Sequence, residues 1–188
     1  MGSIIIYSRK MVGWEVCERE SSEYASEVVS RAVWAEECLD TPLVLHSDNW
    51  SPMKDSTLRA TMERLGITAS YCRPRVSNDN PYSEATFKTC KYRPDYLVQG
   101  FESLEAARIW VHGFVLWYNT KHRHSGILFV TLEERHRRQD GEILAKRKSV
   151  YTIAQAEHPE HWSGNTRNGE PVRAVWLNPE TPLPVEVK

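Results

Sequence analysis

The sequence has 188 residues, of which 40% are hydrophobic and 26% are charged, a composition typical of one globular domain with its own core and not of a fibrous or disordered chain. No run approaches the roughly 18 apolar residues that span a bilayer, and the first residues lack the features of a secretory signal, so we expect a cytoplasmic protein. The formal net charge of −1 excludes a uniformly basic chain, but Lys and Arg outnumber Asp and Glu between Lys88 and Lys148, which predicts one basic region.

The N-terminal part is expected to form a hairpin, a helix and a strand. The β-prone runs 4–7 and 11–16 flank a polar turn and predict the hairpin. Ser22 is placed to cap a helix whose apolar positions recur on one face. These positions are Ala25, Val28, Val29 and Ala32. The short apolar run 42–45 predicts a buried strand, with Asp48 at its C-terminal end.

Four more elements follow along the chain. A second helix is expected to end at Gly66, the residue best suited to a left-handed conformation, and the alternation over residues 67–72 predicts a half-buried strand. Asn80 followed by Pro81 predicts a capped third helix, and a fourth begins at Ser103. The apolar stripes are Leu58, Met62 and Leu65 on the second helix, and Leu104, Ala107, Val111, Phe114, Val115 and Tyr118 on the fourth.

Strands that alternate with helices indicate an α/β or α+β fold. A further helical stretch is expected after Gly126, and the spaced prolines beyond Gly164 predict an extended tail without a core of its own. We therefore expect a core domain over residues 1–135 and a C-terminal helical segment with its tail over residues 136–188.

Two carboxylates are placed where separate elements can bring them together. Asp48 follows a predicted strand, and Glu84 lies about one turn into a predicted helix. Carboxylate oxygens suit Mg²⁺, and a pair of such ions supports phosphoryl transfer. The alternative is structural, because an acid after a strand is often a turn residue and a Glu near a helix start complements the helix dipole.

Lys88 and Lys91 share a helix face with Glu84, at spacings of four and seven residues. Lysines in this position would meet an approaching phosphate backbone. The alternative interpretation is an ordinary salt bridge within the helix.

Three segments together resemble transposases of the insertion-sequence-three family: HSDN at residues 46–49, RPRVSNDNPYSE at residues 73–84, and YNTKHRHSGI at residues 118–127. The resemblance extends over nearly the whole chain. The 35 residues between Asp48 and Glu84 match the interval of the family's Asp-Asp-35-Glu signature, and Lys91 falls where the family carries Lys or Arg.

The resemblance implies a ribonuclease-H-like integrase core with a mixed sheet flanked by helices. In that family three acids hold two divalent ions, Mg²⁺ or Mn²⁺, and the element's ends are cleaved and joined to target DNA. Asp48 and Glu84 match the second and third acids, as catalytic and metal-binding residues. Lys88, Lys91, Lys121 and Arg123 are the expected DNA-binding cations. Transposon-end and target DNA, and further transposase subunits, are the expected partners of a nucleoid-associated protein.

The first acid of the family lies on a first strand upstream of the predicted hairpin, so we expect this chain to lack both that strand and that acid, and to be inactive. Two smaller departures are Trp50, where the family has Gly, and Leu132, where it has Pro. The rival hypothesis is a non-catalytic module that binds DNA or full-length transposase as an inhibitor. A zinc site that joins His158 and His161 to His122 or His124 is a third alternative, although no cysteine has suitable spacing.

Overall fold

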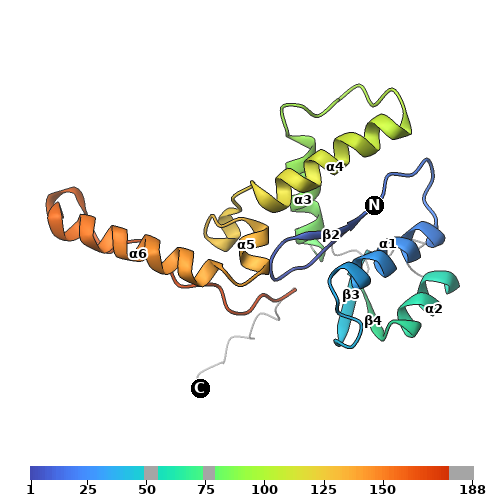
Figure 1. Ribbon diagram of the computed structural model, residues 1–188, viewed down its shortest axis with the longest axis horizontal. Helices are drawn as coiled ribbons and strands as arrows, with labels where there is room; N and C mark the ends of the chain where they lie inside the picture. Colours follow the sequence, from blue (N-terminus) through green and yellow to red (C-terminus); the bar gives the residue numbers. More distant parts are fainter. Residues whose placement is uncertain (49–54, 74–78, 178–188) are drawn as a thin grey trace, which may run out of the picture.

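The computed structural model describes residues 1–48, 55–73 and 79–177. The strands are β1 (Gly2–Ile4), β2 (Met11–Trp14), β3 (Leu43–Ser47) and β4 (Ile67–Tyr71). The α-helices are α1 (Ser22–Ala35), α2 (Ser56–Arg64), α3 (Pro81–Lys91), α4 (Leu104–Thr120), α5 (Leu132–His136) and α6 (Asp140–Glu157), with short 3-10 helices η2 (Ser125–Ile127) and η3 (Pro159–His161). Figure 1 shows α6 extending as an arm away from the other elements. Within these ranges no helix is long and apolar enough to cross a membrane.

The expected single mixed sheet is wrong for the residues described, which form two separate two-stranded sheets. β1 and β2 pair antiparallel as the predicted hairpin, but β1 ends at Ile4, so residues 5–7 lie outside the strand. β3 and β4 pair in parallel over their whole length, from Leu43 with Ile67 to Ser47 with Tyr71. Two-stranded sheets are marginal by themselves, so packing against helices must hold each one in place.

β3 and β4 are less buried than the sequence suggested. The Val44 side chain on β3 is 67% exposed, and Ile67 is the buried residue of β4. A central strand of a parallel sheet is buried because neighbouring strands cover both of its edges and helices cover both of its faces. A strand with one neighbour lacks part of this cover and is therefore more exposed.

The helices form largely where the sequence places them, and their caps differ in detail. Ser21, not Ser22, caps α1, since its side chain accepts a hydrogen bond from the Tyr24 amide. Pro81 does open α3, but the Asn80 side chain makes no capping hydrogen bond. Ser103 caps α4 as expected, and Gly66 adopts the left-handed conformation with φ of 67°. The Leu132 side chain is fully buried at the start of α5, so the fold accommodates this departure from the family pattern.

Two hydrophobic clusters make up the core. The aliphatic cluster lies between α1, α2 and β4 and consists of Ala25, Val29, Val33, Leu58, Met62, Leu65 and Ile67. The aromatic cluster joins β2 and α4 to η2, α5 and α6 and consists of Met11, Phe114, Val115, Tyr118, Ile127, Val130, Leu132 and Leu144. The chain after η3, as far as residue 177, has no helix or strand, in agreement with the expected extended tail. Residues 178–188 and Trp50 lie outside the described ranges.

Candidate functional site

Asp48 stands at the C-terminal end of β3, as the sequence predicted. The parallel ladder with β4 runs up to Ser47, and the Ser47 carbonyl accepts a further hydrogen bond of 2.9 Å from the Cys72 amide. The backbone is therefore fixed directly before Asp48, whose side chain is exposed. A rigid strand end with an exposed acid is a suitable position for a ligand residue.

Glu84 lies in the first turn of α3 and is also exposed. The helix is anchored on its other side: the Thr86 hydroxyl lies 3.1 Å from the Tyr118 hydroxyl in the aromatic cluster. The Arg9 guanidinium stacks 3.8 Å above the ring of Tyr82, two residues before Glu84. These buried contacts orient α3, so that Glu84 points outward from a fixed helix.

Asp48 and Glu84 both act electrostatically on the Cys72 thiol. Burial raises the pKa of Cys72, and the negative charges of Asp79, Asp48 and Glu84 raise it further. Asp48 also lines a groove together with Asn80, Tyr82 and Ser83 from the start of α3. The structure thus brings the end of β3 and the first turn of α3 to one place.

Two features of this region were missed in the sequence. The buried carboxylate of Asp79 accepts hydrogen bonds from the Arg73 amide at 2.6 Å and from its guanidinium at 2.8 and 3.1 Å, and these bonds lower the pKa of Asp79. His46 lies 3.0 Å from the Ser70 hydroxyl and 3.4 Å from the Cys72 thiol. The contact between Arg73 and Asp79 had a weak sequence signal, namely an Arg and an Asp on either side of a short polar loop. The contacts of His46 had no such signal, because they depend on the register of β3 with β4.

The oxygen donors of Asp48 and Glu84 fit a hard divalent cation. Among the described residues neither carboxylate is held in an ion pair, so the alternative of a salt bridge between Glu84 and Lys88 or Lys91 is wrong. Lys88 and Lys91 are exposed in the last turn of α3, farther along the same helix as Glu84.

The other two predicted cations lie beyond α4. Lys121 is the C-terminal cap of that helix and is exposed. Arg123 is exposed as well, but its guanidinium donates a 3.1 Å hydrogen bond to the Phe129 carbonyl, and its backbone bridges to Thr131. Arg123 therefore has a structural contact that the sequence did not predict.

The alternative zinc site is wrong within the described ranges. There the side chains of His158, Glu160 and His161 form the one set of three potential ligands close enough to share an ion, and it includes neither His122 nor His124. All three side chains are exposed at η3.

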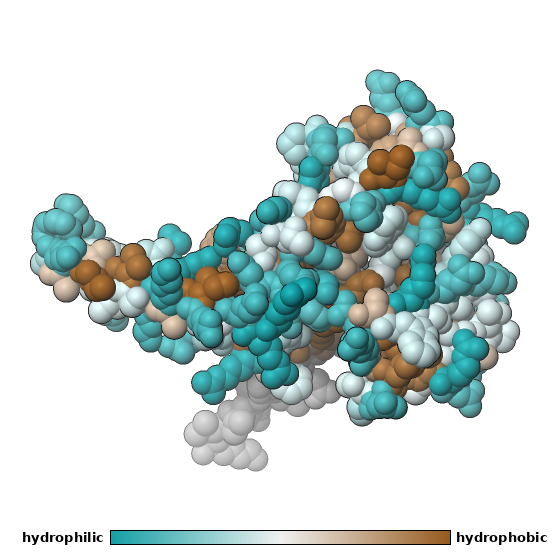
Figure 2. All heavy atoms as spheres, viewed as in Figure 1, coloured by the Kyte–Doolittle hydropathy of each residue, from teal (hydrophilic) through white to brown (hydrophobic). Residues whose placement is uncertain are grey.

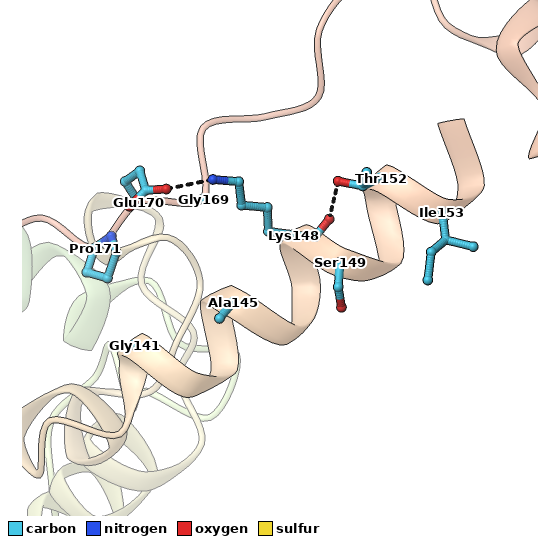
Figure 3. Close-up of a pocket in the computed structure, with 9 residues that line it drawn as sticks. All are labelled: Gly141, Ala145, Lys148, Ser149, Thr152, Ile153, Gly169, Glu170 and Pro171. Atoms are coloured by element: carbon cyan, nitrogen blue, oxygen red, sulfur yellow. Dashed lines mark hydrogen bonds and ion pairs between the residues drawn. The ribbon is translucent and has the colours of Figure 1, made fainter. Parts of the chain in front are cut away.

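Figure 3 shows a separate shallow hollow of about 500 Å³ between α6 and residues 169–171. Its walls are held together by an ion pair of 2.7 Å between Lys148 and Glu170. Lys148 and Glu170 neutralise each other in this pair. The hollow contains neither Asp48 nor Glu84, so it is not part of the acidic site.

Comparison with known proteins gives a consistent result. Two models described as integrase core domain match residues 4–77 and residues 65–131. The transposase for insertion sequence element IS904 of Lactococcus lactis subsp. lactis (strain IL1403) is 29% identical over 126 residues, which are 66% of this chain and 49% of that protein. The chain thus spans about half the length of this curated relative.

One solved structure shows the same fold. The catalytic core domain of BIV integrase aligns with a TM-score of 0.52 and 19% identity, over 86% of this chain and 88% of that chain. A chain of the simian T-cell lymphotropic virus intasome in complex with the PP2A regulatory subunit B56 gamma aligns with a TM-score of only 0.43 and 16% identity, over 64% and 41% of the two chains. The chain therefore matches integrase core domains in sequence, is distantly homologous to the IS904 transposase, and has the fold of a retroviral integrase catalytic core.

Proposed function

We propose that this chain is the core part of a DNA transposase, in which Asp48 and Glu84 serve metal-dependent cleavage and joining of DNA strands. The observation that carries the proposal is that Asp48 and the first turn of α3, where Glu84 lies, border one groove, with both acids exposed and in no ion pair among the described residues. The matches to integrase core domains and to the IS904 transposase support it. The core comprises residues 1–135, and residues 136–188 form a C-terminal helical segment and tail.

Asp48 and Glu84 would hold Mg²⁺ or Mn²⁺ through their carboxylate oxygens. Bound ions of this kind supply charge that activates an attacking oxygen and stabilises the leaving one. The protein's own contribution is position: β3 fixes Asp48, and the packing of α3 on Tyr118 fixes Glu84. Lys88 and Lys91 on α3, with Lys121 and Arg123 beyond α4, would contact the phosphates of transposon-end and target DNA.

We further propose that the chain is catalytically inactive, because a site for two ions needs more ligands than Asp48 and Glu84 supply. No third His, Cys, Asp or Glu in the described ranges offers an atom close to both Asp48 and Glu84. Asp79 is the nearest additional acid by its effect on Cys72, but Arg73 donates hydrogen bonds to both of its carboxylate oxygens. Two carboxylates bind one ion weakly, whereas in-line displacement needs both reacting oxygens stabilised.

Manganese titration followed by electron paramagnetic resonance tests the metal site. We expect weak binding of Mn²⁺ that falls about tenfold or more in Asp48→Asn and in Glu84→Gln, because each change removes a charged ligand. Glu63→Gln, which alters an exposed acid on α2, is the matched control and should leave the affinity unchanged. Equal affinity in all four proteins would contradict the proposed metal site.

A strand-transfer assay on transposon-type ends tests the proposed inactivity. No cleaved or joined product is expected with Mg²⁺ or Mn²⁺. If the wild type forms product and Asp48→Asn does not, an additional ligand completes the site. That result would contradict the proposed inactivity and would support the metal role of Asp48.

One observation favours a second candidate function, that of a non-catalytic inhibitor bound to full-length transposase. Val150, Tyr151 and Ile153 expose apolar surface on α6, and Figure 2 shows apolar side chains along this arm. Exposed apolar surface of this kind favours association with another protein. Co-purification with a full-length transposase, lost in Ile153→Lys, would support this function, and retention of the complex by that variant would exclude α6 as the contact.

A further inference from the structure

His46 and Cys72 face each other near the C-terminal end of the β3–β4 ladder. The Nε2 atom of His46 lies 3.4 Å from the Sγ atom of Cys72. The backbone around this pair is fixed, because the ladder runs up to Ser47 and the Cys72 amide then donates a hydrogen bond to the Ser47 carbonyl. Both side chains are half-buried, so an ion from solvent can reach them.

The distance between these two atoms fits two ligands of one tetrahedral ion. Zinc binds sulfur at about 2.3 Å and imidazole nitrogen at about 2.0–2.1 Å, so the two ligand atoms lie roughly 3.5 Å apart. The observed 3.4 Å agrees with this value. A thiol hydrogen bond can have the same length, so the orientation of the ring and the local charge also enter the argument.

Ser70 orients the imidazole ring of His46. It is the partner of His46 in the β3–β4 ladder, and its hydroxyl lies 3.0 Å from the Nδ1 atom of the ring. A proton on Nδ1 that is donated to this hydroxyl leaves the lone pair of Nε2 directed toward the Cys72 sulfur. Metal-binding histidines are usually held in this way through their second ring nitrogen.

The surroundings of the pair are acidic. Asp79, Asp48 and Glu84 all act electrostatically on the Cys72 thiol. Arg73 balances Asp79 through hydrogen bonds to both carboxylate oxygens, whereas Asp48 and Glu84 are exposed. Asp48 lies two residues after His46, on the same face of the extended chain. Its exposed carboxylate can therefore turn toward the pair.

We propose that His46 and Cys72 bind one Zn²⁺ ion, with Asp48 turned toward them as the third ligand and water as the fourth. Thiolate and imidazole ligands select Zn²⁺, whereas the oxygen ligands of Asp48 and Glu84 suit Mg²⁺. Binding breaks the S–H bond and forms a Zn–S bond, and the proton passes to solvent. The inference does not depend on DNA cleavage. Bound Zn²⁺ would withdraw Asp48 from the acidic site.

Cobalt titration of the full, reduced chain tests the site, because Co²⁺ can replace Zn²⁺ and its bond to a thiolate gives a charge-transfer band in the near ultraviolet. We expect this band to saturate at one Co²⁺ ion per chain and to disappear when Zn²⁺ is added. Cys72→Ser should abolish the band. Cys90→Ser, which changes another half-buried thiol, is the matched control and should retain it.

Further variants separate this site from the acidic site. Ser70→Ala removes the partner of the ring and should weaken Co²⁺ binding about 10–100-fold, and His46→Ala, which removes a ligand, should weaken it more. Glu84→Gln should lower the affinity for Mn²⁺ and leave the cobalt band unchanged, so the two metal proposals can fail independently. Circular dichroism checks that each variant is folded.

A second measurement needs no variant. Saturating Zn²⁺ should slow alkylation of Cys72 in the wild type, followed by mass spectrometry, and should not slow alkylation of Cys90, because only a thiol bound to the ion is shielded. The proposal is overturned if bound Co²⁺ gives no thiolate band, if Cys72→Ser retains the band, if His46→Ala binds with unchanged affinity, or if Zn²⁺ fails to protect Cys72. Binding without the band would place the ion on nitrogen and oxygen ligands, such as those at η3.

Discussion

The two hydrophobic clusters hold the molecule in different ways. The aliphatic cluster packs α1 and α2 against β4 with branched and small side chains, and it positions β3, which carries Asp48. The aromatic cluster is built on α4, where Trp110 stacks on Phe114 with ring centroids 5.8 Å apart and Phe114 on Tyr118 at 5.5 Å. It positions α3, which carries Glu84, through the contact between Thr86 and Tyr118. Each candidate ligand therefore depends on a different cluster.

The hairpin and α1 join the two halves, and Glu36 at the end of α1 hydrogen-bonds both Lys10 and His136. α1 contacts both strands of the hairpin and also packs on α2, and β2 is tied to α4 by the Asn119 side chain, which bonds both the amide and the carbonyl of Met11. The groove that Asp48 lines is bordered by β1 on one side and by β3 on the other. The relative position of Asp48 and Glu84 is thus set by the joint between the clusters and not by either core alone. Mutations can separate these contributions.

The largest effects are expected inside the clusters. Leu58→Ala and Leu132→Ala each truncate a fully buried side chain, and each should cost about 2–5 kcal/mol of unfolding free energy. Because the sheets are not continuous, we expect non-cooperative unfolding, in which Leu58→Ala lowers one transition and Leu132→Ala another. Urea denaturation followed by circular dichroism and by tryptophan fluorescence measures both. A single sharp transition moved equally by the two variants would show that the halves unfold as one unit.

The clusters were the most predictable part of the fold. Helical spacing describes the apolar stripes of α1, α2 and α4, including the row Leu58, Met62 and Leu65 on α2. Most of these side chains are buried as expected. Amphipathic periodicity is a local property, so one sequence suffices to read it. The sequence also placed Asp48 directly after a strand and Glu84 in a first helical turn.

The separation into two sheets was not predictable, because strand pairing depends on contacts between distant residues. The 42–45 run gave no sign that Val44 would be exposed. The bond between His46 and Cys72 and the closure of a loop by Arg73 and Asp79 also depend on register and on tertiary packing. Residue spacing alone could indicate the candidate acids, but not that both would be outside any ion pair among the described residues.

A glycine at the joint offers a smaller and more specific test. A Cβ atom on Gly13 of β2 would lie 2.9 Å from the Val28 Cγ1 of α1 and 3.2 Å from the Val28 carbonyl, closer than packed atoms allow. Gly13→Ala should therefore push the hairpin away from α1 and cost about 1–3 kcal/mol. Gly113→Ala on α4 has open space around it and should stabilise the helix by about 0.5–1 kcal/mol. Thermal unfolding of both proteins measures the contrast, and equal behaviour would mean that the joint is loosely packed.

The Asp79 carboxylate is expected to make a pH-dependent contribution near the joint. Hydrogen bonds from Arg73 lower its pKa in the folded protein, so its stabilising effect is present above the unfolded pKa of about 4 and is lost as pH falls through the folded value. The stability difference between the wild type and Asp79→Asn should be constant from about pH 5 to 7 and shrink below about pH 4. Urea denaturation across this range measures it, with Asp40→Asn, at an exposed position, as control. A difference that persists at low pH would assign the effect to packing.

The smallest expected effect concerns DNA and identifies which half of the molecule faces it. Lys91 is exposed at the end of α3, and Arg64 is exposed at the end of α2 beside the aliphatic cluster. If phosphates lie along α3, Lys91→Ala should weaken binding to all DNA sequences alike and reduce the slope of log affinity against log salt by about 0.9, the contribution of one phosphate contact. Arg64→Ala removes the same charge on the other half and should leave the slope unchanged. Fluorescence anisotropy with two unrelated duplexes at several salt concentrations measures the slopes. An unchanged slope in Lys91→Ala with a reduced one in Arg64→Ala would place the DNA on the aliphatic half, because the number of released counterions follows the cations that contact phosphate.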